Sequence, residues 1–127
     1  MAVKRQALGR WGEQLAAEYL EAQGYAILAR NVRTGYGEID LVARQDGVAA
    51  VTVFAEVKTR RSGTFGLPEQ SVTAAKQAHM AAAAQAYMLS HPELTGEWRL
   101  DVIAIRGAPG QANPEIIHFE NAITGAN

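Results

Sequence analysis

The chain has 127 residues, of which 48% are hydrophobic and 20% charged, as is typical of one globular domain with a single core. The absence of cysteine excludes a disulfide framework, a zinc–cysteine site and a cysteine nucleophile. A net charge of -1 argues against a protein that coats DNA without specificity. The charge is uneven, however, because residues 1–61 carry nine Lys or Arg against seven Asp or Glu, and residues 62–127 carry three against six.

The terminal segments suggest a soluble protein. No apolar stretch follows the basic start, so no secretory signal is predicted. No apolar run approaches the roughly 20 residues of a membrane helix. We therefore expect a cytoplasmic protein without a membrane partner, built as one domain over residues 1–120 with a loose tail at 121–127.

A helix and a strand are expected first. Apolar residues at helical spacing predict an amphipathic helix over residues 4–23, which Gly24 ends. Residues 25–32 are rich in β-forming types and predict a short strand. The glycines in the cluster at 34–37 predict a turn after it.

A hairpin is expected next. Residues 38–45 alternate in polarity and predict a strand. One face should carry Ile39, Leu41 and Ala43, and the other Glu38, Asp40 and Val42. The pair Asp46-Gly47 predicts a tight turn, and the Val- and Phe-rich residues 48–59 are the expected partner strand.

The second half predicts a helix between two loops, then two more strands. The expected segments are a loop at 60–68, an Ala-rich helix at 69–90, a strand at 98–105, a loop at 107–114 and a short strand at 115–119. Asp101, among apolar neighbours, is expected to make structural hydrogen bonds. The order helix, three strands, helix, strand, short strand predicts a mixed α/β sheet flanked by helices.

The candidate chemistry lies at the end of the third strand. Glu56 and Lys58 are two residues apart and therefore project from the same face, after an apolar run typical of a buried strand. Hairpin pairing brings Asp40 close to Glu56. Crowded carboxylates repel each other, and a divalent cation such as Mg²⁺ relieves that repulsion while also binding a substrate phosphate. The grouping therefore favours metal-assisted phosphate chemistry, with the lysine beside the reacting phosphate.

Each of these residues also has a simpler interpretation. A Glu-x-Lys pair on a strand is commonly a solvated ion pair of little energetic value, and an Asp in a hairpin is commonly an exposed polar residue. Glu13 shares a helical stripe with Ala16, Ala17 and Leu20, which is unusual for a solvated face. Its alternative is a boundary position whose carboxylate reaches water. Phosphate contacts at the mouth of the site are considered for three cations, for each of which an ordinary surface charge is at least as good an interpretation: Arg60, Arg61 and Lys76.

Two segments together resemble a known family. Residues 37–43, Gly-Glu-Ile-Asp-Leu-Val-Ala, and residues 54–60, Phe-Ala-Glu-Val-Lys-Thr-Arg, look like the YraN-type uncharacterised family. That family is regarded as similar to archaeal Holliday-junction resolvases and other PD-(D/E)xK nucleases. The resemblance runs from residues 9–13 to residues 99–103, and it implies a restriction endonuclease-like fold.

The resemblance also implies roles for individual residues. Asp40 and Glu56 match the metal-ligating acids, and the carbonyl of Val57 is an expected further ligand. Lys58 matches the catalytic lysine. Glu13 matches the acid of the first helix that contacts the site directly or through water. The implied cofactor is Mg²⁺ or Mn²⁺.

We therefore expect an enzyme, a metal-dependent endonuclease that cuts branched, flap or single-stranded DNA. One alternative is a non-catalytic nucleic-acid-binding or scaffold protein on the same fold, and another is a small-molecule phosphoesterase. Junction-cutting relatives act as dimers, so the resemblance raises a homodimer as a further expectation.

Overall fold

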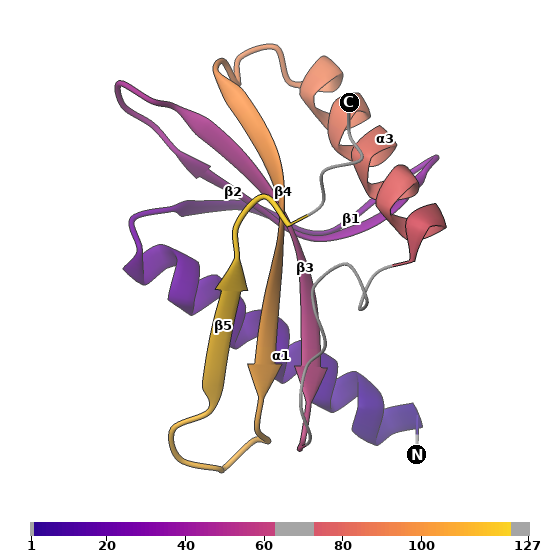
Figure 1. The fold of residues 1–127 in the computed structure, drawn as a ribbon, viewed down its shortest axis with the longest axis vertical. Coiled ribbons are helices and arrows are strands. Elements are labelled where there is room, and N and C mark those ends of the chain that lie inside the picture. The colour runs from indigo at the N-terminus through magenta and orange to yellow at the C-terminus, as the bar shows by residue number, and fades with distance from the viewer. Residues whose placement is uncertain (1, 63–72, 123–127) are drawn as a thin grey trace.

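The structure is a computed structural model that describes residues 2–62 and 73–122 (Figure 1). Its elements follow the chain in the order α1 (Ala2–Ala22), β1 (Ala26–Thr34), β2 (Gly37–Gln45), β3 (Val51–Arg60), α3 (Ala74–Ser90), β4 (Glu97–Arg106) and β5 (Glu115–Phe119).

The strands form one mixed sheet in the order β1-β2-β3-β4-β5. Strands β3 and β4 pair in parallel, and the other neighbours pair antiparallel. A parallel pair needs a crossover connection, and α3 lies within that connection. The expectation of a mixed α/β sheet with helices is confirmed.

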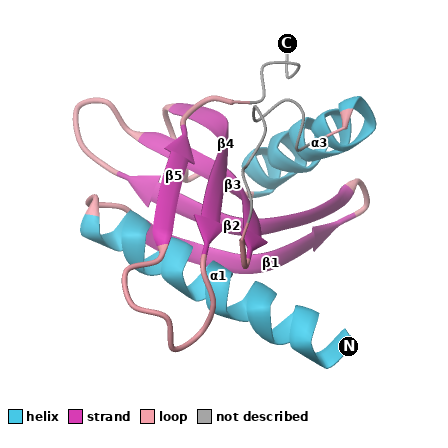
Figure 2. Cartoon of the chain, turned by 60° about the horizontal axis from the view of Figure 1, so that its bottom comes forward, coloured by secondary structure: helices cyan, strands magenta, loops and turns pink. Residues whose placement is uncertain are grey.

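The two helices cover opposite faces of the sheet, as Figure 2 shows. Along β3 the apolar side chains alternate between these faces, since Phe54 packs with α3 while Val53 and Ala55 pack with α1. The buried side chains on the α3 face are Ile39, Val42, Phe54, Met80, Ala83, Ala84, Leu100 and Val102. Those on the α1 face are Ala16, Ala17, Leu20, Leu41, Ala43, Val53, Ala55, Ile103 and Ile105.

The connection between β2 and β3 differs from the expected tight turn. Gln45 pairs with Val51, so five residues, 46–50, form the turn, and β3 begins three residues later than expected. Gly47 has a positive φ of 130°, as a turn glycine should. The side chain of Val48 is fully exposed, so its apolar character did not indicate a strand.

The second helix also begins later than residue 69. Thr73 has extended backbone angles, and its side-chain oxygen accepts a hydrogen bond from the Lys76 N–H, as an N-cap residue does. Residues 69–72 lie outside the described part of the chain. The strand at 115–119 is confirmed with its expected bounds.

Asp101 makes the structural hydrogen bonds expected of it. Its carboxylate is fully buried and accepts bonds from Arg99 Nε at 3.0 Å and from the Asn121 N–H at 2.8 Å, while His118 Nε2 lies 2.7 Å away. Tyr19 of α1 reaches the other ring nitrogen of His118 at 3.1 Å. This network joins α1, β4, β5 and the first residue of the expected tail.

No helix in the two described ranges is long and apolar enough to span a membrane.

A close helix–strand contact places α1 against the end of β3. A Cβ atom added at Gly12 would lie 2.0 Å from Thr59 Oγ1 and 3.0 Å from Thr59 Cβ, which is far inside van der Waals contact. A Cβ added at Gly9, one turn earlier, would meet nothing within 4 Å. The absence of a side chain at Gly12 therefore sets the spacing at which the adjacent Glu13 meets the sheet.

These two glycines give a matched pair of variants. Gly12→Ala should destabilise the protein by about 1–3 kcal/mol, because Thr59 and the helix must move apart. Gly9→Ala should stabilise it by about 0.5–1 kcal/mol through helix propensity alone. Urea unfolding monitored by circular dichroism measures both. Equal effects of the two substitutions would show that the α1–β3 contact is not close.

A pH dependence of stability follows from Asp101. Burial alone would raise its pKa, but hydrogen bonds from His118, Arg99 and Asn121 outweigh burial and hold the pKa below its ordinary value. The stabilisation is therefore complete above about pH 4, the unfolded-state pKa, and is lost as the pH falls towards the folded-state pKa. Asp101→Asn should cost about 3–5 kcal/mol at pH 7. That cost should shrink below pH 4 in urea titrations. The exposed Glu97→Gln is the control, and a pH-independent cost of Asp101→Asn would contradict the assignment.

Candidate active site

The candidate site forms where β2 and β3 separate. Their pairing ends at Leu41 and Ala55, although β2 extends back to Gly37 and β3 continues to Arg60. Beyond this point the two strands diverge, as Figure 1 shows. The N–H of Val57 donates to Asp40 Oδ2 at 2.8 Å, so a carboxylate replaces the neighbouring strand as its partner.

The five-residue turn is what aligns the two acids. In the observed register Gln45 lies opposite Val51, so the two residue numbers of every facing pair add up to 96. Asp40 therefore falls opposite Glu56, at the position where pairing stops. A two-residue turn would pair Gln45 with Val48 and shift the register of β3 by three residues. Asp40 would then lie opposite Val53 and not opposite Glu56. The proximity of Asp40 and Glu56 was expected, but the turn that produces it was not.

Glu56 is a buried carboxylate with two lysine partners. Its side chain is 5% exposed, and its Oε1 lies 2.6 Å from Nζ of Lys76 and 3.6 Å from Nζ of Lys58. A solvated ion pair on the strand surface is therefore excluded for Glu56 and Lys58. Lys76, considered as a phosphate contact at the mouth of the site or as a surface cation, extends from α3 to Glu56 with its side chain 44% exposed.

Asp40 carries the clearest electrostatic signature of the site. Burial, together with the nearby charge of Glu56, raises the pKa of Asp40 to about 7, although the Val57 N–H bond opposes the shift. Asp40 is therefore only partly ionised near neutral pH beside the carboxylate of Glu56. A pair of carboxylates in this state is a favourable location for a cation.

Glu13 approaches the same acids from the α1 face. Burial raises its pKa, the charges of Glu38 and Glu56 raise it further, and a side-chain hydrogen bond with Asn31 opposes the shift. The stripe expected around Glu13 is buried, since Ala16, Ala17 and Leu20 are inaccessible to solvent. Glu13 is therefore half-buried beside the candidate site and is not an ordinary solvated residue of the helix.

Asn31 also lies at the candidate site, through its hydrogen bond with Glu13, although the sequence offered no reason to single it out. It has a positive φ of 51°, uncommon for a residue other than glycine. By the β1–β2 register it lies opposite Asp40. Side chains of a regular strand alternate between faces, so residues three apart lie on opposite faces. On both strands this rule fails around the pair, because Ala29 and Val32 pack on the α3 face, as do Ile39 and Val42.

The expectation that Ile39 shares a face with Leu41 and Ala43 is therefore wrong. The left-handed backbone of Asn31 interrupts the regular pleat of β1, and β2 bends with it. The bend turns Asp40 towards β3 and leaves the Asn31 side chain to meet Glu13. An Asn before an alternating strand is the only sequence signal of this feature, because Asn tolerates left-handed angles.

The donor set suits a small, hard cation. Carboxylate oxygens of Asp40 and Glu56 meet here, and the carbonyl of Val57 points to the same side of β3 as its N–H. Mg²⁺ typically takes one or two carboxylates and completes its shell with water and substrate phosphate. Within residues 2–62 and 73–122, no group of three or more His, Cys, Asp or Glu is arranged as a cage that would hold an ion by itself.

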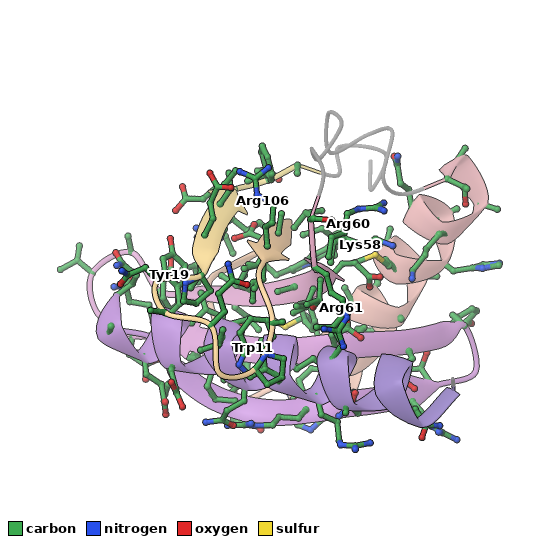
Figure 3. The ribbon with its side chains drawn as sticks, turned by 90° about the horizontal axis from the view of Figure 1, so that it is seen from below. Trp11, Tyr19, Lys58, Arg60, Arg61 and Arg106 are labelled. Carbon is green, nitrogen blue, oxygen red and sulfur yellow. The ribbon has the colours of Figure 1, made fainter. Side chains whose placement is uncertain are left out.

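The other expected phosphate contacts lie further along β3. Arg60 follows Lys58 on the α3 face, whereas Arg61 turns towards α1, as Figure 3 shows. Both are exposed, and neither side chain forms a hydrogen bond or ion pair with another described residue. A hollow of about 320 Å³ also opens beside α3, next to Lys76. Its lining residues are Gly37, Glu38, Thr73, Ala75, Lys76, His79 and Met80.

The role of Asn31 can be tested by separating its backbone from its side chain. Asn31→Gly keeps the left-handed conformation and should leave stability nearly unchanged, whereas Asn31→Ala should cost roughly 1–2 kcal/mol. Both variants remove the hydrogen bond and should raise the pKa of Glu13 further, as measured by NMR titration of its carboxyl carbon in EDTA. An unchanged Glu13 titration in Asn31→Gly would show that the two side chains are not coupled.

Comparison with known proteins places the chain in a family. Residues 12–105 match the model of "Uncharacterised protein family UPF0102". A UPF0102 protein of Syntrophotalea carbinolica is 45% identical over 96% of this chain and 95% of its own length. Corresponding values are 47%, 91% and 96% for one from Syntrophomonas wolfei, and 42%, 99% and 100% for one from Roseiflexus castenholzii. The resemblance to the YraN-type family is thereby confirmed, and the protein belongs to the uncharacterised family UPF0102.

Proposed function

We propose that this protein is a metal-dependent nuclease that hydrolyses phosphodiester bonds of DNA, on a restriction endonuclease-like fold. The observation that carries the proposal is the meeting of Asp40, Glu56 and two lysines where β2 and β3 separate. Carboxylates that require a cation, placed beside ammonium groups that attract a phosphate, are the parts that phosphodiester hydrolysis needs.

Asp40 and Glu56 would hold Mg²⁺ or Mn²⁺, with the Val57 carbonyl as a further oxygen ligand. When bound, such an ion neutralises charge on the phosphate and lowers the pKa of water. Buried walls around these acids reduce competition from solvent, since Glu56 is 5% exposed.

The lysines divide the remaining work. Lys58 Nζ is 3.6 Å from Glu56 Oε1, and the lysine side chain is 28% exposed. Lys58 can therefore orient the attacking water and stay close to the phosphate. Lys76 Nζ, bonded to Glu56 at 2.6 Å, balances the charge of that buried carboxylate. Glu13, half-buried with a raised pKa, is placed to accept or share a proton at the edge of the site.

Cleavage assays test the proposal directly. Labelled linear, single-stranded, flap and four-way-junction DNA are incubated with Mg²⁺, Mn²⁺ or EDTA. We expect cutting that needs metal. We expect Asp40→Asn and Lys58→Ala to lower its rate by at least about 100-fold. The matched control is Asp46→Asn, the same chemical change at a carboxylate that is 82% exposed in the β2–β3 turn.

Circular dichroism and thermal melts show whether each variant is folded. Asp40→Asn should remain folded, because an uncharged amide avoids the cost that burial and the charge of Glu56 impose on an ionised Asp40. Full-rate cutting by Asp40→Asn would refute the mechanism. Binding without cutting by the unmodified protein would instead establish the non-catalytic alternative. Hydrolysis of small phosphodiesters without a preference for DNA would establish the phosphoesterase alternative.

A further inference from the structure

A second basic feature lies at the carboxyl ends of β3 and β4, beyond the acid pair. An open hollow of about 510 Å³ is lined by Arg61, Ser62, Arg106, Gln111, Asn113 and Glu115. Figure 3, viewed towards these strand ends, shows Arg60 and Arg61 at the end of β3 and Arg106 at the end of β4. None of the roles considered above uses Arg106 or the loop that follows it.

The walls of this hollow are fixed by the backbone. The parallel register pairs Arg60 with Arg106, and the Gly107 N–H donates to the Arg60 carbonyl at 2.9 Å. This bond continues the β3–β4 ladder by one step and holds the start of the loop beside Arg61. The loop then turns at Gln111, whose N–H donates to the Ala108 carbonyl at 3.0 Å.

The lining is rich in hydrogen-bond donors. The lining residues are two arginines, a serine, a glutamine and an asparagine, against a single acidic residue, Glu115. Glu115 forms an ion pair with Arg106 and thus offsets part of its charge. Planar guanidinium forks match the oxygens of a phosphate group and can bind them in pairs. The chemistry of the lining therefore selects a phosphate-bearing anion.

The position of the hollow points to a polymer and not to an isolated phosphate. Lys58 and Arg60 project from the same face of β3 as Glu56, so cations continue from the acid pair towards the strand end. Arg61 is five positions after Glu56, about 17 Å along a strand, and it leaves the end of β3 on the α1 side, so the path turns around the strand end there. A nucleic-acid strand carries a regular series of phosphates, so one strand that follows this path can contact both places through different phosphates.

We propose that the Arg61–Arg106 hollow binds a backbone phosphate of the nucleic-acid strand whose other end lies at the acid pair. The proposal rests on the proposed function for the path of the strand, but binding in the hollow requires neither metal nor cleavage. Glu115 acts as the competing anion that the phosphate must displace from Arg106. Loss of Glu115 should therefore tighten binding, whereas loss of either arginine should weaken it.

The test is binding of a fluorescent 12-nucleotide oligothymidylate in EDTA, measured by anisotropy at several salt concentrations. Arg61→Ala and Arg106→Ala should each weaken binding by about tenfold. Each should also reduce the slope of log affinity against log salt by about 0.7, the value for one contact on a single strand. Glu115→Gln should tighten binding several-fold. The controls are Arg33→Ala at the far end of the β1–β2 hairpin and Glu97→Gln at the opposite end of β4, which change net charge equally.

Two outcomes would overturn the proposal. In the first, the arginine variants Arg61→Ala and Arg106→Ala are folded by thermal melt but change affinity and salt slope no more than Arg33→Ala does. In the same outcome, Glu115→Gln changes affinity no more than Glu97→Gln does. The other is that a dinucleotide binds as tightly as the 12-nucleotide strand, which would indicate a site for an isolated phosphate. Arginine-dependent binding without any cleavage would support the hollow and refute the nuclease. Metal-dependent cleavage with unchanged binding in all three variants would support the nuclease and refute the hollow.

Discussion

The site depends on the hydrogen bond from the Val57 N–H to Asp40 Oδ2. A backbone N–H in the middle of a sheet must find an acceptor, and the separation of β2 from β3 removes the usual one. Asp40 supplies the missing acceptor, and in doing so it fixes a carboxylate beside Glu56. The same break in pairing that opens the sheet thus positions the acid that gives the opening its chemistry.

Every charge drawn into this opening is compensated in a different way. Asp40 has a backbone donor, Glu56 has the ammonium groups of Lys58 and Lys76, and Glu13 has the side chain of Asn31. These partners come from both faces of the sheet and from three elements, β1, β3 and α3. Asp40 nevertheless remains only partly ionised near neutral pH, because burial and the charge of Glu56 raise its pKa to about 7. This residual crowding is the physical basis of our proposal that a cation completes the site.

The sequence predicted the elements that rest on periodicity and the acids that rest on strand alternation. It did not predict the five-residue turn, because valine is typical of strands whereas the exposed Val48 lies in the turn. It also could not reveal the bend at Asn31, since a single left-handed residue changes which face later side chains occupy without altering composition. Lys76 was predicted only as a possible phosphate contact or surface cation, without a partner among the acids. Its contact with Glu56 depends on where α3 crosses the sheet, a tertiary property absent from local sequence.

The parallel pairing of β3 with β4 has a consequence for the order of folding. Asp40 and Glu56 are 16 residues apart and meet through a local antiparallel hairpin, whereas Val51 and Glu97, at the start of the parallel ladder, are 46 residues apart. Closing the longer loop is entropically more expensive and slower, so local pairing precedes it. The two carboxylates therefore converge before α3 docks and brings Lys76 to them. During that interval their mutual repulsion opposes the hairpin, and dissolved cations or mild acid should favour the chain's progress through the step.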